Sequence, residues 1–198
     1  MADHTETEVK LYVPHLEIVQ VRLERLGAKL VTPRVYERNV RYDNADHSLT
    51  PAGIVLRLRQ DTRVHLTYKD SAAVQDGIVS RFEAEVEVSD FDTMDTILRK
   101  MGYIPYMMYE KYRTTYELDG AEIVLDELPY GNFVEIEGDV ETIERVISRV
   151  ELDSATRYAA SYVALFESVK RNLGLDFNDL TFANFEGVSV SEEAFPYT

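Results

Sequence analysis

Two spacings of apolar residues alternate along the chain, one of two residues and one close to 3.6. The first predicts about eight strands, over residues 6–13, 35–43, 53–60, 64–69, 80–88, 111–118, 122–126 and 132–137. The second predicts helices over residues 16–26, 91–101, 140–150 and 155–173. Gly27, Gly102 and Gly174 directly follow three of these helices, where a glycine commonly ends a helix. The chain therefore predicts an α+β fold.

Nearly every predicted strand carries charged residues at alternate positions. Residues i and i+2 of a strand point to one face, so Glu6, Glu8 and Lys10 form one charged row. Taken alone, such a row is typical of a solvent-exposed face. The same arrangement recurs along the chain in seven basic and seven acidic residues: Lys10, Arg57, Arg59, Lys69, Arg81, Lys111, Arg113, Glu6, Glu8, Glu83, Glu85, Asp126, Glu135 and Glu137.

The alternate residues on these strands are apolar, as at Phe82 and Val86, and we expect them to pack under the helices. The charged face must then point inward. About eight strands can close into a barrel whose interior holds side chains or one small ligand. We therefore expect a closed antiparallel eight-stranded β-barrel, with helices packed outside and a charged tunnel inside.

Burying so many charges is costly unless they are paired or bound to a ligand. Guanidinium groups contact phosphate oxygens in pairs, and lysines add compact positive charge. Clustered carboxylates suit Mg²⁺ or Mn²⁺, which take oxygen ligands and bridge to phosphates. The interior therefore predicts that the partner is a small-molecule triphosphate bound together with divalent metal ions.

Composition narrows the classes of function. A formal net charge of −15 argues against a general nucleic-acid binder, because binding to the phosphate backbone needs clustered, accessible Lys and Arg. The chain has no cysteine, which excludes disulfides, thiolate metal sites and cysteine nucleophiles. No apolar stretch suits a signal peptide or a membrane span, so we expect a cytoplasmic protein that does not contact a membrane.

Residues 1–174 contain all of the predicted strands and helices, and we expect them to form one domain. The C-terminal extension, residues 175–198, contains Phe177, Phe182, Phe185 and Phe195, which are too many aromatics for a typical disordered tail. We expect this extension to pack on the domain or on the partner subunit of a homodimer, with the first three of these rings buried.

Residues 6–10 resemble the E-x-E-x-K signature of the CYTH, or triphosphate tunnel metalloenzyme, family. The resemblance continues in the family's order through residues 56–59, 66–69, 81–87, 111–113 and 126–137, and it covers roughly residues 6–170. It implies a barrel tunnel that uses divalent metal. The family includes class IV adenylyl cyclases, thiamine triphosphatases and inorganic triphosphatases. Its members commonly show an acidic residue and a tyrosine in the second strand, where this chain has Arg41 within Asn39-Val40-Arg41-Tyr42-Asp43.

The resemblance also implies roles for the charged residues. Metal binding or water positioning is expected of Glu6, Glu8, Asp126, Glu135 and Glu137, and phosphate binding of Lys10, Arg57, Arg59, Lys69, Arg81, Lys111 and Arg113, while Glu83 and Glu85 suit either role. Catalysis is expected of Glu8, Glu137 and Lys69. An ordinary lysine is a poor base at neutral pH, so phosphate binding is the safer assignment for Lys69.

Three functions remain open. The preferred one is metal-dependent hydrolysis of a triphosphate-containing substrate, with tripolyphosphate, thiamine triphosphate and ATP as candidates. The first alternative is a class IV adenylate cyclase that converts ATP to cyclic AMP and pyrophosphate, which additionally needs a nucleoside pocket. The second is a non-catalytic module that binds polyphosphate or nucleotide, and the presence of the metal-type carboxylates disfavours it.

Overall fold

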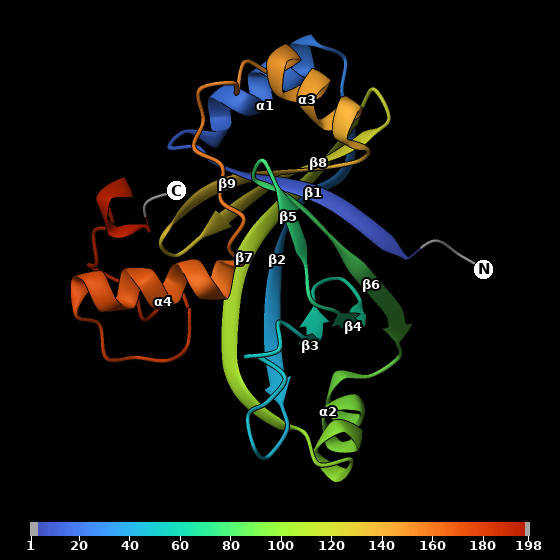
Figure 1. The fold of residues 1–198 in the computed structure, drawn as a ribbon, viewed down its shortest axis with the longest axis vertical. Helices are drawn as coiled ribbons and strands as arrows, with labels where there is room; N and C mark the ends of the chain where they lie inside the picture. Colours follow the sequence, from blue (N-terminus) through green and yellow to red (C-terminus); the bar gives the residue numbers. More distant parts are fainter. Residues whose placement is uncertain (1–3, 197–198) are drawn as a thin grey trace.

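The computed structural model describes residues 4–196, which form a closed ring of antiparallel strands with helices around it (Figure 1). The strands are β1 (Thr5–Tyr12), β2 (Lys29–Asp43), β3 (Val55–Gln60), β4 (Val64–Lys69), β5 (Ala73–Gln75), β6 (Ile78–Val88), β7 (Ile104–Leu118), β8 (Ala121–Leu128) and β9 (Gly131–Glu137). The helices are α1 (Leu16–Arg25), α2 (Phe91–Lys100), α3 (Val140–Arg149) and α4 (Tyr162–Leu173), and η1 (Glu192–Ala194) is a 3₁₀ turn.

Strand β1 closes the ring, because it pairs with β9 along one edge and with β6 along the other. Neighbouring strands follow the order β1-β9-β8-β7-β2-β3-β4-β6. The predicted closed antiparallel arrangement of eight strands is therefore confirmed. The ninth strand, β5, pairs only with β6 and is too short to show alternation in the sequence. In this order β2 lies on the side of the ring opposite β1.

Helices α1 and α3 lie together over one end of the ring (Figure 1). They pack against β1, β8 and β9, and the core between them includes the fully buried side chains of Leu11, Ile123 and Ile136. Asp139 starts α3, because its carboxylate accepts a hydrogen bond of 2.8 Å from the backbone N–H of Thr142. Within residues 4–196, none of the helices is both long and apolar enough to cross a membrane.

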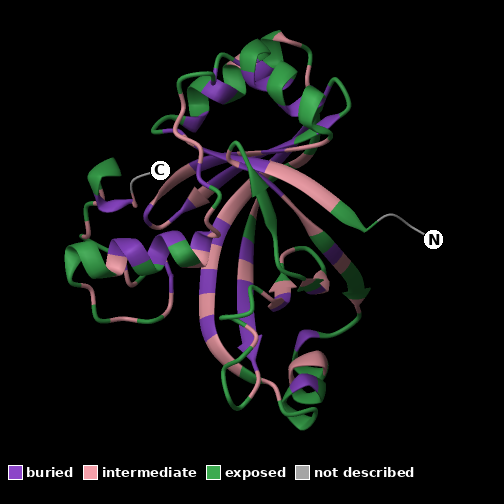
Figure 2. Ribbon diagram, viewed as in Figure 1, coloured by how far each residue is buried: buried purple, intermediate pink, exposed green. Residues whose placement is uncertain are grey.

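Helix α2 follows β6 in sequence but packs against β3 and β7, where Phe91 and Leu98 join a separate core cluster around Leu58. As a result, part of the outer face of β6 has no helix over it. Phe82 is 43% exposed and Val86 is 56% exposed, and Figure 2 shows much of this strand as exposed. The expectation that these two side chains pack under helices is therefore wrong.

The last helix begins at Tyr162 and not at residue 155. The hydroxyl of Ser161 accepts a hydrogen bond from the N–H of Ala164, which fixes the start of α4. The residues before it run beside β1 instead: the N–H of Tyr158 donates to the carbonyl of Lys10 at 2.9 Å. Pairing between β1 and β6 has ended at Val9, so this segment occupies a free edge of β1.

The C-terminal extension packs on its own chain, against α4 and β7. Leu180 forms two backbone hydrogen bonds with β7, each 2.9 Å long. Phe185 and Phe195 are buried, whereas Phe177 and Phe182 are half-buried. These contacts join the extension to the aromatic core that contains α4. The domain boundary at residue 174 stays a prediction, and residues 197–198 lie outside the described chain.

Candidate active site

The ring encloses a cavity of about 300 Å³, to which all eight strands of the ring contribute side chains. This volume lies at the lower end of the range for small-molecule sites. Thirteen of the fourteen predicted site residues line the cavity: Glu6, Glu8, Lys10, Arg57, Arg59, Lys69, Arg81, Glu83, Glu85, Lys111, Arg113, Glu135 and Glu137. The alternation along each strand brings them together, since inward positions recur every second residue.

Charge divides the lining into two halves. The carboxylate half consists of the adjoining strands β6, β1, β9 and β8, and the cationic half consists of β7, β2, β3 and β4. Within residues 4–196, all seven carboxylates of the lining come from the carboxylate half. The cationic half supplies six of the eight lining cations: Arg41, Arg57, Arg59, Lys69, Lys111 and Arg113. A ligand in the cavity therefore meets mainly carboxylates on one side and cations on the other.

Two side chains of the carboxylate half hold protons near neutral pH. Burial raises the pKa of Glu6 to about 8, with a further contribution from its hydrogen bond to Glu83. Burial also raises the pKa of Glu137 to about 7, and neighbouring carboxylates add to the effect. The pKa of Glu83 is lowered although burial opposes it, because Glu6 donates to it and Lys69 contacts it. Like charges are thus crowded on this side of the tunnel.

A divalent cation fits the carboxylate half by the chemistry of its donors. Carboxylate oxygens suit Mg²⁺ and Mn²⁺, and Mg²⁺ is commonly held by one or two carboxylates plus substrate phosphates. In the described part of the chain, no three His, Cys, Asp or Glu side chains are arranged to hold a metal by themselves. Glu6, Glu8 and Glu137 therefore suit a cation shared with substrate oxygens better than one enclosed by protein alone.

Asp126, the fourteenth predicted residue, lies behind the cavity lining. It has no exposed surface. Its carboxylate accepts hydrogen bonds from Lys111 Nζ at 3.0 Å, from Arg113 Nε at 2.8 Å and from the Tyr162 hydroxyl at 2.8 Å. These contacts fix the directions in which the two cations point. Its metal-binding role stays a prediction, and its contacts favour the positioning of Lys111 and Arg113.

Glu135 is also held between cations. It contacts Lys10 Nζ at 3.0 Å and accepts from Arg113 at 2.8 Å. Burial alone would raise the pKa of Glu135, but the charges of Lys10, Arg113 and Lys111 keep it well below its usual value. Glu37, which the sequence analysis did not single out, is buried beside Lys111 and has a pKa of about 2, because nearby cations outweigh burial. These carboxylates keep the tunnel's cations in place.

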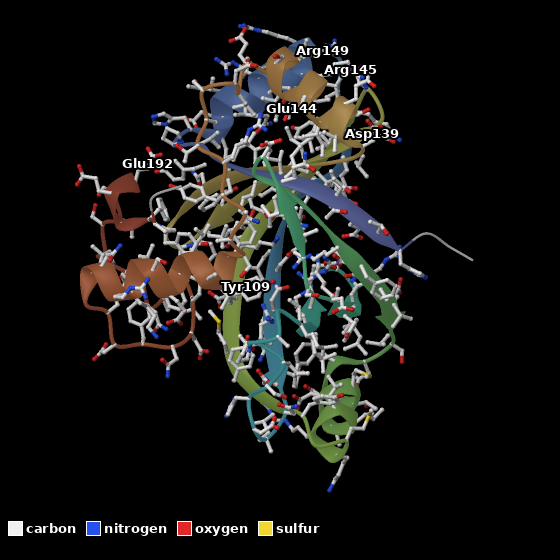
Figure 3. All side chains as sticks on the ribbon, in the orientation of Figure 1. Tyr109, Asp139, Glu144, Arg145, Arg149 and Glu192 are labelled. Carbon is white, nitrogen blue, oxygen red and sulfur yellow. The ribbon has the colours of Figure 1, made fainter. Side chains whose placement is uncertain are left out.

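Strand β3 presents two arginines to the cavity. Arg57 donates to the Tyr109 hydroxyl at 3.2 Å, and Arg59 donates to Glu85 at 2.9 Å. Figure 3 labels Tyr109 on β7. Burial would raise the pKa of this phenol, but the charges of Arg57, Lys111 and Arg41 lower it below its usual value. The hydroxyl of Tyr109 thus lies among cations.

Arg41, Tyr109 and Glu122 line the cavity beyond the predicted set. Arg41 lies between Val40 and Tyr42, which are buried in the outer core. The alternation along β2 therefore predicts that the side chain of Arg41 points into the ring. Tyr109 lies in the part of β7 that precedes the predicted strand at residue 111. The sequence analysis therefore missed Tyr109, because it predicted too short a strand there.

The sequence also matches a known protein family, the CYTH domain. The model of that family matches residues 4–162, so the chain belongs to the CYTH family. Among individual relatives, a Methanocaldococcus jannaschii protein named "Putative adenylate cyclase" is 25% identical over 140 residues, which cover 70% of this chain and 79% of that protein.

Solved structures share the fold. A Pyrococcus horikoshii protein has a TM-score of 0.68 at 23% identity and covers 79% of this chain and 96% of its own. A Hippeastrum protein, described as an adenylyl cyclase candidate with a dominant triphosphatase activity, has a TM-score of 0.63 at 20% identity. That match covers 82% of this chain and 95% of the Hippeastrum chain. At these identities the likeness concerns the fold alone.

Proposed function

We propose that the protein is a triphosphatase that hydrolyses a small triphosphate in the tunnel with the help of Mg²⁺ or Mn²⁺. The observation that carries this proposal is the division of the lining into a carboxylate half and a cationic half. A phosphate chain between them has guanidinium and ammonium groups on one side. On the other side it has carboxylates that suit a shared cation.

The chain's own residues bind and orient the substrate. Arg57, Arg59, Lys111 and the other cations of the lining fix the phosphate oxygens and offset charge that develops during transfer. Glu6, Glu8 and Glu137 would hold the cation, which supplies Lewis-acid stabilisation of the phosphoryl group when bound. Glu83 holds Lys69 toward the cavity, and this contact suits a phosphate contact for that lysine.

Asp126 and Glu135 act behind the substrate in this proposal. Each forms ion pairs with two cations of the tunnel, so a cation that turns away loses its ion pair with a buried carboxylate. Lys10, Lys111 and Arg113 are therefore preorganised before a substrate arrives. Preorganisation of this kind avoids reorganisation during the reaction.

Adenylate cyclisation is the second candidate, because the relative from M. jannaschii carries that name. It would use the same phosphate-binding cations but transfer the α-phosphoryl group to the ribose hydroxyl. The partner of the tunnel is a small-molecule triphosphate in both cases. We place the protein in the cytoplasm under either function.

One assay separates the candidates. Purified protein is incubated with tripolyphosphate, thiamine triphosphate or ATP in Mg²⁺ or Mn²⁺, and the products are resolved as phosphate, pyrophosphate or cyclic AMP. We expect phosphate release, and we expect Glu8→Gln to lower it more than about tenfold, since a ligand is lost. Glu186→Gln, at an exposed position of the extension, is the matched control. Cyclic AMP with pyrophosphate would establish the cyclase instead, and no turnover of any substrate would contradict both.

A further inference from the structure

Arg41 differs from the other cations of the tunnel. It lines the cavity from β2, and only 6% of its surface is exposed. Each of the other seven lining cations has a carboxylate within 4.0 Å. Arg41 has none among residues 4–196, and its Nε is buried without a hydrogen-bond acceptor. A buried guanidinium without a carboxylate is costly unless an anion reaches it.

The neighbour of Arg41 makes the arrangement less favourable still. Arg41 lies directly opposite Arg57 in the β2–β3 ladder, and like charges in such a pair are destabilising. Arg57 meets Glu85 at 3.4 Å, but Glu85 also accepts the shorter bond from Arg59. The Nε of Arg57 is likewise buried without an acceptor. Of the two facing arginines, only Arg57 thus has a carboxylate partner, and it shares that partner with Arg59.

Packing on an aromatic ring does not account for Arg41. Its guanidinium carbon lies 5.9 Å from the centroid of the Tyr106 ring, at the outer limit of a cation–π contact. Such a contact leaves the N–H donors of the guanidinium without acceptors. These N–H donors therefore need acceptor oxygen atoms, which a ligand in the cavity can supply.

We propose that Arg41 and Arg57 form a two-arginine clamp that binds one phosphoryl group of the substrate, and that Arg41 is a specificity-determining residue of the tunnel. The proposal rests on the proposed function, because it assumes that a phosphate chain occupies the cavity. Two planar guanidinium groups present paired donors that match the oxygens of one phosphoryl group. The bound anion also relieves the repulsion between the arginines. The free energy of binding is therefore more favourable here than at a cation already paired with a carboxylate.

The test measures binding without turnover. Tripolyphosphate is titrated calorimetrically into the full chain in EDTA, without divalent metal, and the parent is compared with Arg41→Gln and Arg41→Lys. We expect Arg41→Gln to weaken tripolyphosphate binding at least about tenfold. We expect Arg41→Lys to weaken it less, because lysine keeps the positive charge but lacks the paired donors of a guanidinium group. Arg34→Gln is the matched control, since it makes the same change on an exposed part of β2. We expect its affinity to stay within about twofold of the parent.

A melting curve of each ligand-free variant shows whether the variant is still folded. Removing one of two facing like charges should leave the melting temperature of Arg41→Gln equal to or above that of the parent. A lower melting temperature would overturn the proposal, as would tripolyphosphate affinity equal to the parent's or an equal loss in Arg34→Gln. The two proposals fail separately: if Arg41→Gln loses affinity but the parent turns over no triphosphate with metal, the clamp stands and hydrolysis is wrong. No binding by the parent would overturn both.

Discussion

Glu6 and Glu137 illustrate how neighbouring residues change the chemistry of a carboxyl group. Both lie in the carboxylate half of a partly buried tunnel, and the pKa values rise to about 8 and about 7. Glu135, on the same strand as Glu137, lies between cations and has a pKa well below its usual value. Two residues of one sequence motif therefore differ in charge near neutral pH, because their positions along the strand give them different neighbours.

This difference predicts a pH dependence of stability. Folding raises the pKa of Glu137 from 4.5 to about 7, so the folded state holds a proton that the unfolded state releases in this window. The free energy of unfolding of the metal-free protein should therefore contain a term that falls as pH rises from about 4.5 to about 7. Glu137→Gln removes this term. Denaturant unfolding in EDTA across this range should show a smaller decline for the variant than for the parent.

Glu186→Gln is the control for that experiment, because this side chain is exposed and lies outside the tunnel. It should keep the parent's dependence on pH. An identical decline in the parent and in Glu137→Gln would contradict the raised pKa of Glu137. Lowered pKa values, such as that of Glu37 at about 2, act in the opposite sense, and their contribution is lost only at more acid pH.

At the scale of elements, alternation predicted the strands well, because a ring with a charged interior and an apolar exterior imposes a strict period of two. Alternation could not predict how deeply a side chain is buried. Asp126 shares a strand face with Glu122, yet it lies beneath the cations of the neighbouring strand β7. Local sequence also missed the start of α4, because residues 156–158 pair with β1 from far along the chain. Contacts with residues far away in the sequence determine both the burial of Asp126 and the start of α4.

The C-terminal extension supports a stability prediction of its own. Phe185 is 6% exposed and packs against Phe166 and Tyr130, so truncation leaves a cavity in the aromatic core. Phe185→Ala should lower the free energy of unfolding by about 3–5 kcal/mol. Phe82→Ala is the matched control, since that ring is 43% exposed. Equal losses in denaturant unfolding of the two variants would show that the extension contributes little to the fold.

At the scale of the whole molecule, charge is distributed unevenly between the tunnel and the rest of the chain. The cavity lining holds eight of the 21 basic residues but only seven of the 36 acidic ones. All of the excess negative charge therefore lies outside the cavity. Close contacts inside the tunnel decide ligand binding, because solvent ions screen distant exposed charges beyond about 8 to 10 Å at physiological salt.

The excess negative charge predicts the response of stability to salt. Exposed carboxylates repel one another in the compact state, and the screening length falls from about 10 Å at 0.1 M salt to about 3 Å at 1 M. The melting temperature of the ligand-free protein should therefore rise between these two concentrations of KCl. Choline chloride should give a similar rise if screening is the cause and specific cation binding is not. A falling melting temperature would mean that salt weakens the ion pairs of the tunnel more than it relieves the outer repulsion, and would contradict this account.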